Sequence, residues 1–127
     1  MLLDFCIYHT VHWKIYCFDA FSALEPLYKD QNINYNICCL SNVDDLSVKF
    51  YQNDFLFGGN SIYREIGWDN GACFPEDKFI IKPTRTLDSV VKEKNYRLPD
   101  LIKIDVQGAE LNILKGSAEK SNMQRQN

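Results

Sequence analysis

Glycine is scarce in this chain, which has six among 127 residues and none before Gly58. A nucleotide-binding oxidoreductase needs a G-x-G-x-x-G turn directly after its first strand, because glycine lets the backbone approach a phosphate closely. No such turn follows the first apolar stretch of the chain. Such an oxidoreductase is therefore the less favoured alternative for this sequence.

Long apolar runs are also absent, and so is any excess of basic residues. Fourteen Lys and Arg stand against seventeen Asp and Glu, which gives a net charge of −3. Nucleic-acid-binding domains usually carry a basic patch, and a membrane-spanning helix needs about 20 consecutive apolar residues. We therefore expect neither nucleic acid nor a membrane as a partner.

The cysteines do not form a disulfide framework. The chain has five, an odd number, with no Cys-x-x-Cys pair and with Cys38 and Cys39 adjacent. Disulfide-stapled secreted domains usually carry an even number at open spacings, and the apolar start lacks the basic region of a signal peptide. We expect reduced thiols and a cytoplasmic protein. Cys6, His9 and His12 could share a helix face, but three such ligands do not close a structural zinc site, so we expect no metal.

Strand-like and helix-like stretches alternate along the chain. Strands are predicted at residues 14–18, 35–40, 46–51, 79–81 and 101–106, and helices around 2–11, 22–28, 86–91 and 109–115. Such alternation is typical of an α/β fold with a parallel sheet. Residues 46–81 depart from it and predict an attached antiparallel hairpin.

Two strands deliver an acid at their carboxyl ends. Asp19 follows the strand at 14–18, and Asp105 lies near the end of the strand at 101–106. Ligands of open α/β sheets bind beyond the carboxyl ends of the strands, where a carboxylate can accept hydrogen bonds from a ribose or face a cation. An acid in this position can also simply cap a helix, and both readings stay open.

The segment DLIKIDVQGAELNILKG, residues 100–116, resembles the signature of FkbM-like methyltransferases. That signature reads as an apolar run, Lys-Ile-Asp, an acidic or amide residue, Gly-Ala-Glu, and a Leu-rich helix ending in Lys-Gly. Residues 86–88 (Thr-Leu-Asp) and 40–42 (Leu-Ser-Asn) are similar to further family elements in the same order, and Asp19-Ala20 stands where the family has Glu-Pro. The resemblance covers residues 14–118.

This resemblance implies a partial Rossmann-like, class I methyltransferase fold: a parallel sheet with an attached antiparallel hairpin. It would occupy residues 1–118, followed by a polar tail at 119–127. The implied function is transfer of a methyl group from S-adenosylmethionine to an oxygen atom of a small-molecule or sugar-like acceptor. Transfer to nitrogen is the less favoured alternative. Ser61 is similar to a serine in the family's variable loop.

The resemblance also assigns site residues. Asp19 would hold the cofactor ribose, and Ser41 and Asn42 would lie near the adenine. Asp105 would sit beside the transferring methyl group and act as a base. Glu110 would anchor the start of the following helix, although attraction of an acid to the helix dipole explains this position equally well.

One departure from the family pattern concerns the start of the fold. The family opens with a central strand and a glycine-rich turn that holds the methionine end of the cofactor, whereas no glycine precedes Gly58. That strand would lie between residues 14–18 and 101–106, and the family's later strands have no counterpart after Gly116. We expect a fragment that is inactive alone. The alternative is a non-catalytic piece that acts through protein partners, or self-associates, at an exposed sheet edge.

Overall fold

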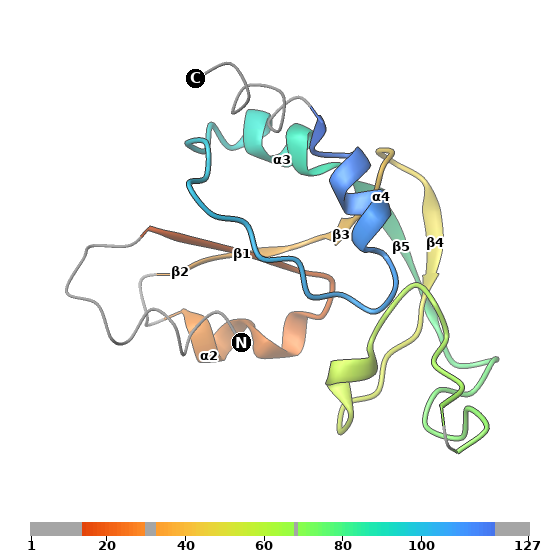
Figure 1. The fold of residues 1–127 in the computed structure, drawn as a ribbon. Helices are drawn as coiled ribbons and strands as arrows, with labels where there is room; N and C mark the ends of the chain where they lie inside the picture. The colour runs from red at the N-terminus through yellow and green to blue at the C-terminus, as the bar shows by residue number, and fades with distance from the viewer. Residues whose placement is uncertain (1–13, 30–32, 68, 119–127) are drawn as a thin grey trace.

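The computed structural model describes residues 14–29, 33–67 and 69–118 (Figure 1). Its strands are β1 (Ile15–Asp19), β2 (Ile33–Ile37), β3 (Cys39–Leu40), β4 (Ser47–Phe50) and β5 (Ile80–Arg85). Its helices are η1 (Ser22–Leu24), α2 (Glu25–Tyr28), η2 (Phe57–Gly59), α3 (Leu87–Glu93) and α4 (Glu110–Lys115). The predicted helix at residues 2–11, with its cysteine and two histidines nearby, lies outside the described residues.

The strands form two small sheets. β1 pairs with β2 in parallel, with Asp19 opposite Ile37, whereas β5 pairs in parallel with β3 and in antiparallel with β4. The predicted α/β class and the antiparallel hairpin are therefore confirmed. The predicted single parallel sheet is only partly present, because the strand expected at 35–40 breaks at Cys38. The Cys38 N–H donates instead to the Asp19 carbonyl at 2.9 Å, which joins the end of β1 to the start of β3.

The prediction of a strand at residues 101–106 is wrong. These residues form no regular structure and run as a coil between α3 and α4 (Figure 1). Leu101 is 62% exposed and Ile102 44% exposed. A strand persists only when its backbone N–H and C=O groups pair with a neighbouring strand, and none of the described strands pairs with this segment. The apolar pattern is present, but no strand among the described residues pairs with it.

The buried core lies where the two sheets meet. Ala20, Cys39 and Phe50 form a buried cluster, and Val48 and Ile62 pack against it. The buried Cys39 agrees with the expectation of a thiol in the core, and the four cysteines in the described residues are all free. This cluster lies directly behind the carboxyl end of β1, so it supports the position of Asp19.

The Thr-Leu-Asp element at residues 86–88 begins α3. Thr86 is its N-cap and accepts a hydrogen bond from the Ser89 N–H at 3.1 Å. The carboxylate of Asp44, 42 residues away, accepts from the Thr86 N–H at 2.8 Å and from the Ser89 hydroxyl. These bonds, the one from Ser89 first, lower the pKa of Asp44. The element is thus tied to the loop that precedes β4.

No helix within the described parts of the chain is long and apolar enough to cross a bilayer.

Candidate functional site

Asp19 is the last residue of β1 and is half-buried. One carboxylate oxygen, Oδ1, accepts a hydrogen bond from the Phe21 N–H at 2.8 Å. Burial raises the pKa of Asp19, and hydrogen bonding from Phe21 and the positive charge of Lys82 partly oppose that rise. The acid therefore lies at the end of a parallel strand, where open α/β sheets bind ligands, with its water shell partly removed.

Ser41 and Asn42 directly follow β3. Ser41 is buried, and its N–H donates to the Arg85 carbonyl at 2.8 Å while its hydroxyl donates to Asn42 Oδ1 at 3.2 Å. Asn42 is exposed. The fold thus uses Ser41 to fix the turn after β3, and Asn42 is exposed in that turn.

Asp105 lies on the unpaired coil. Its side chain is 73% exposed and forms an ion pair with Lys103, at 3.4 Å between Nζ and Oδ2. An exposed pair of this kind contributes little to stability and exchanges readily for other partners. The Asp105 carboxylate is consequently accessible, but no strand fixes its distance from Asp19.

The turn that follows Asp105 is held by the loop between β4 and β5. The Ser61 hydroxyl donates to the Gln107 carbonyl at 2.7 Å, and Gln107 Nε2 donates to the Gly58 carbonyl at 2.7 Å. Gly108 has φ +84°, a conformation that favours glycine, and a Cβ there would lie 3.3 Å from the Tyr63 ring. The sequence singled out Ser61 by family resemblance, but nothing in the sequence marked its contact with a residue 46 positions away.

Glu110 is the first residue of α4. Its Oε1 accepts a hydrogen bond from the Gly108 N–H at 3.3 Å, so its carboxylate satisfies a backbone donor at the start of the helix. This contact fits both readings of Glu110, as an anchor of the turn and as an acid favoured by the helix dipole.

α4 connects the Asp105 turn to the turn after β3. At its end Gly116 packs on the Ser41 carbonyl, and the Gly116 carbonyl accepts from the Asp88 N–H at 3.1 Å. The structure therefore links Asp105, through one short helix, to Ser41, and links Ser41, through β3 and Cys38, to Asp19. Within the described ranges no cluster of His, Cys, Asp or Glu side chains could hold a metal ion.

A comparison with known families shows what the chain is similar to. The sequence model of the methyltransferase FkbM domain matches residues 3–126. The chain belongs to the FkbM methyltransferase domain family. The match extends beyond the resemblance at residues 14–118 and includes every candidate site residue of this FkbM domain. No curated protein and no solved structure matches the chain.

The hydrogen bond between Ser61 and Gln107 predicts that loss of the Ser61 hydroxyl destabilises this FkbM domain. Ser61 is 5% exposed, and its hydroxyl also accepts from the Tyr63 N–H at 3.1 Å. Ser61→Ala should lower the free energy of unfolding by about 1–3 kcal/mol, because it removes two partly buried hydrogen bonds, each of which contributes about 0.5–1.5 kcal/mol. Urea denaturation measures this change. Ser47→Ala, at an exposed position of β4, is the control, and equal effects of the two substitutions would contradict the assignment.

Proposed function

We propose that this FkbM domain is a module of an S-adenosylmethionine-dependent methyltransferase that acts on an oxygen atom of a small molecule. The observation that carries the proposal is Asp19, a half-buried carboxyl group at the carboxyl end of a parallel strand, in a chain of this family. The alternative of a nucleotide-binding oxidoreductase has no comparable support, because the chain lacks the required glycine turn.

The residues at this edge fit the polar groups of the cofactor. When bound, S-adenosylmethionine supplies an electrophilic methyl group. Asp19 would accept hydrogen bonds from the ribose hydroxyls, which would replace water that burial has removed from its carboxylate. The exposed Asn42, held by Ser41, would lie near the adenine. Asp19-Ala20 stands where the family has Glu-Pro. Because the side chain of Asp is one methylene shorter than that of Glu, the ribose would have to approach β1 more closely.

Asp105 would act on the acceptor. Its exposed carboxylate would take the proton of the acceptor hydroxyl, so that the oxygen could accept the methyl group while the sulfonium sulfur of the cofactor leaves as a neutral thioether. The main contribution of the protein is to orient the two reacting groups, and this needs a fixed Asp105. Glu110 and the contact of Ser61 with Gln107 fix the turn on one side of Asp105.

A chemical-shift map tests the proposed cofactor site even when binding is weak. With millimolar S-adenosylmethionine added to the ¹⁵N-labelled chain, we expect the largest amide shifts at residues 19–21, 41–42 and 105–108. Asp19→Asn should reduce the shifts at 19–21, since the amide cannot replace a charged acceptor. Glu76→Gln, at an exposed position of the β4–β5 loop, should leave them unchanged. Shifts spread evenly over the surface, or confined elsewhere, would contradict the site.

Protein–protein contact is a second candidate function. The exposed Leu101 and Ile102 favour it, because apolar side chains on an unpaired backbone can add to another chain. A sedimentation coefficient that rises with concentration, and that Leu101→Lys holds constant, would support this reading. A sedimentation coefficient that does not change with concentration would contradict self-association.

A further inference from the structure

The turn that follows Asp19 is held by two side chains from other strands. Lys82 of β5 donates from its Nζ to the Ala20 carbonyl, and Tyr35 of β2 donates from its hydroxyl to the Phe21 carbonyl at 3.0 Å. The N–H of the same Phe21 donates to the Asp19 carboxylate. The orientation of this carboxylate therefore depends on side chains that are 14 and 62 positions away from the turn in sequence.

Lys82 is half-buried, and more than one contact fixes its ammonium group. The Lys82 Nζ lies 5.1 Å from the centre of the Phe50 ring, within the range of a cation–π interaction, and Phe50 belongs to the buried cluster behind the end of β1. A long Lys side chain usually keeps its ammonium group in water. Here that group instead lies between the core and the turn after β1.

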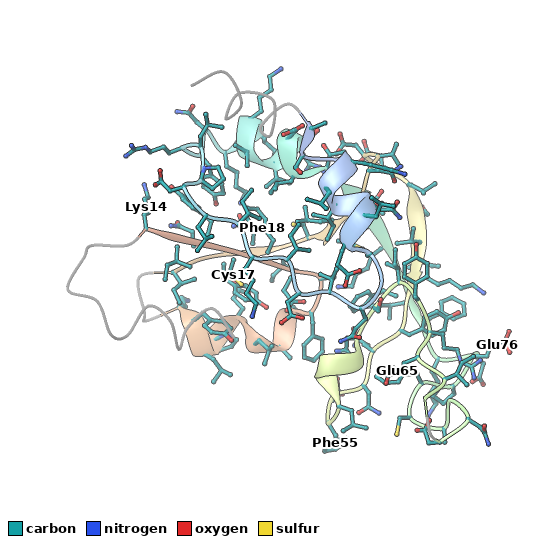
Figure 2. The ribbon with its side chains drawn as sticks, viewed as in Figure 1. Lys14, Cys17, Phe18, Phe55, Glu65 and Glu76 are labelled. Atoms are coloured by element: carbon teal, nitrogen blue, oxygen red, sulfur yellow. The ribbon has the colours of Figure 1, made fainter. Side chains whose placement is uncertain are left out.

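Tyr35 lies on the same face of the β1–β2 sheet as Asp19. Figure 2 shows Cys17 and Phe18 on opposite faces of β1, as the alternation of side chains along a strand requires, so Asp19 shares the face of Cys17. Tyr35 is opposite Cys17 in the parallel register, and its ring stacks on that of Tyr28 in α2 at 5.4 Å. The stacked ring fixes the phenol, so its hydroxyl reaches the turn from a defined position.

The charge of Lys82 also acts on Asp19. Burial raises the pKa of Asp19, and the Phe21 N–H partly opposes this rise. The positive charge of Lys82 and hydrogen bonding from Tyr35 oppose it further. The other titratable groups that the Asp19 charge affects have pKa values raised chiefly by burial, so they are uncharged at neutral pH. These groups are Cys17, Tyr28, Tyr35 and Cys38.

We propose that Lys82 is a positioning residue of the cofactor site: it holds the turn after β1 from one side while Tyr35 holds it from the other, and it places a positive charge beside the Asp19 carboxylate. A carboxylate has about four acceptor positions, so the bonds within the turn leave room for the hydroxyls of a ribose. The identity of this ligand rests on the proposed function; the action of Lys82 on Asp19 does not.

A pH titration of Asp19 tests this role without cofactor. In Lys82→Met, which keeps an apolar stem but has no charge, the ¹³Cγ signal of Asp19 should titrate at a higher pH than in the parent chain. Lys82→Arg, which keeps the charge, should titrate near the parent. Lys49→Met is the matched control, because Lys49 also lies over a ring, that of Phe79 at 4.5 Å, but points to the opposite face of the β4–β5 pair. An unchanged Asp19 titration in Lys82→Met would overturn the proposal.

The parent chain allows a second measurement, which does not depend on a variant that folds. The ¹⁵Nζ signal of Lys82 should shift at the pH at which Asp19 titrates, because the two charges are close together. A Lys82 that only joined the two sheets would still lower stability when replaced, but its Nζ signal would not follow Asp19. The absence of an inflection at that pH would contradict the assignment.

Cofactor binding separates this inference from the proposed function. With S-adenosylmethionine at neutral pH, Lys82→Met and Tyr35→Phe should each raise the dissociation constant, measured from the amide shifts at residues 19–21, by about two- to ten-fold, the share of one hydrogen bond. Because the ionised acid is the stronger acceptor, Lys82→Met should also lose binding at a higher pH than the parent as the pH falls. Unchanged dissociation constants in both variants would overturn the positioning role. If Asp19 titrates as expected but the cofactor shifts no amide at residues 19–21 of the parent chain, only the proposed function fails.

Discussion

Replacing Gly116 with alanine should lower the free energy of unfolding by about 3 kcal/mol, near the upper end of the cost of overpacking. A Cβ at this position would overlap the Ser41 carbonyl oxygen and would lie 3.3 Å from the Asn42 Cα. These neighbours are backbone atoms, fixed by the bond from the Ser41 N–H to the Arg85 carbonyl, so they cannot move aside cheaply. A loss of this size is a large share of the 5–15 kcal/mol that stabilises a typical domain.

Gly58→Ala is the matched control for this prediction. No heavy atom lies within 4 Å of a Cβ built at Gly58, and its φ is not positive, so alanine should be neutral or slightly stabilising there. Thermal and urea unfolding of the two variants measure the difference. Similar stabilities would mean that α4 does not pack on the turn after β3, and the link between Asp105 and Ser41 would be lost with it.

S-adenosylmethionine should bind the 127-residue chain with a dissociation constant near millimolar rather than micromolar. Asp19 and Asp105 can each offer hydrogen bonds, but none of the described strands pairs with the coil at 101–106 to hold Asp105 in place. The chain also has no glycine before Gly58 to let backbone approach the methionine end of the ligand. Binding must then order the site, at a cost of about 2–5 kcal/mol, which weakens a micromolar site by up to roughly a thousand-fold.

Titration calorimetry against the cofactor is the direct measurement. The negative control is Asp19→Ala, which should weaken even millimolar binding by a further factor of about ten to a hundred, the loss of hydrogen bonds to a charged acceptor. A clean micromolar isotherm with one site per chain would contradict the prediction. In that case another part of the chain would hold the methionine end of the cofactor and fix Asp105, the roles that the glycine-rich turn and the paired strand have in the family pattern.

The helices and strands that follow from local sequence patterns lie where the sequence predicts them. The pattern of residues 46–51 predicts a strand, which is β4, and the helix predicted around residues 86–91 is α3, with Thr86 as its N-cap. Lys115-Gly116 ends α4, and Gly116 has φ −78°, so this glycine serves close packing on Ser41 rather than a left-handed turn. The sequence placed the glycine correctly and could not show which neighbour required it.

The residues of the candidate site are likewise of two kinds: those that the sequence marks and those that only the fold brings together. Asp19 could be found because an apolar strand leads directly to it, and Ser61 was marked only by family resemblance. Asp44 could not be found, because it reaches Thr86 and Ser89 across more than 40 positions of sequence.

The sequence by itself determined the family, the α/β class, the order of the acids and the position of most helices and strands, because these follow from motifs and from periodicity within a few residues. Only the tertiary structure decided that residues 101–106 are a coil and that Ser61 holds the turn after Asp105. Each of these depends on what lies beside a segment in space. A strand needs a partner for its backbone, and a hydroxyl needs an acceptor.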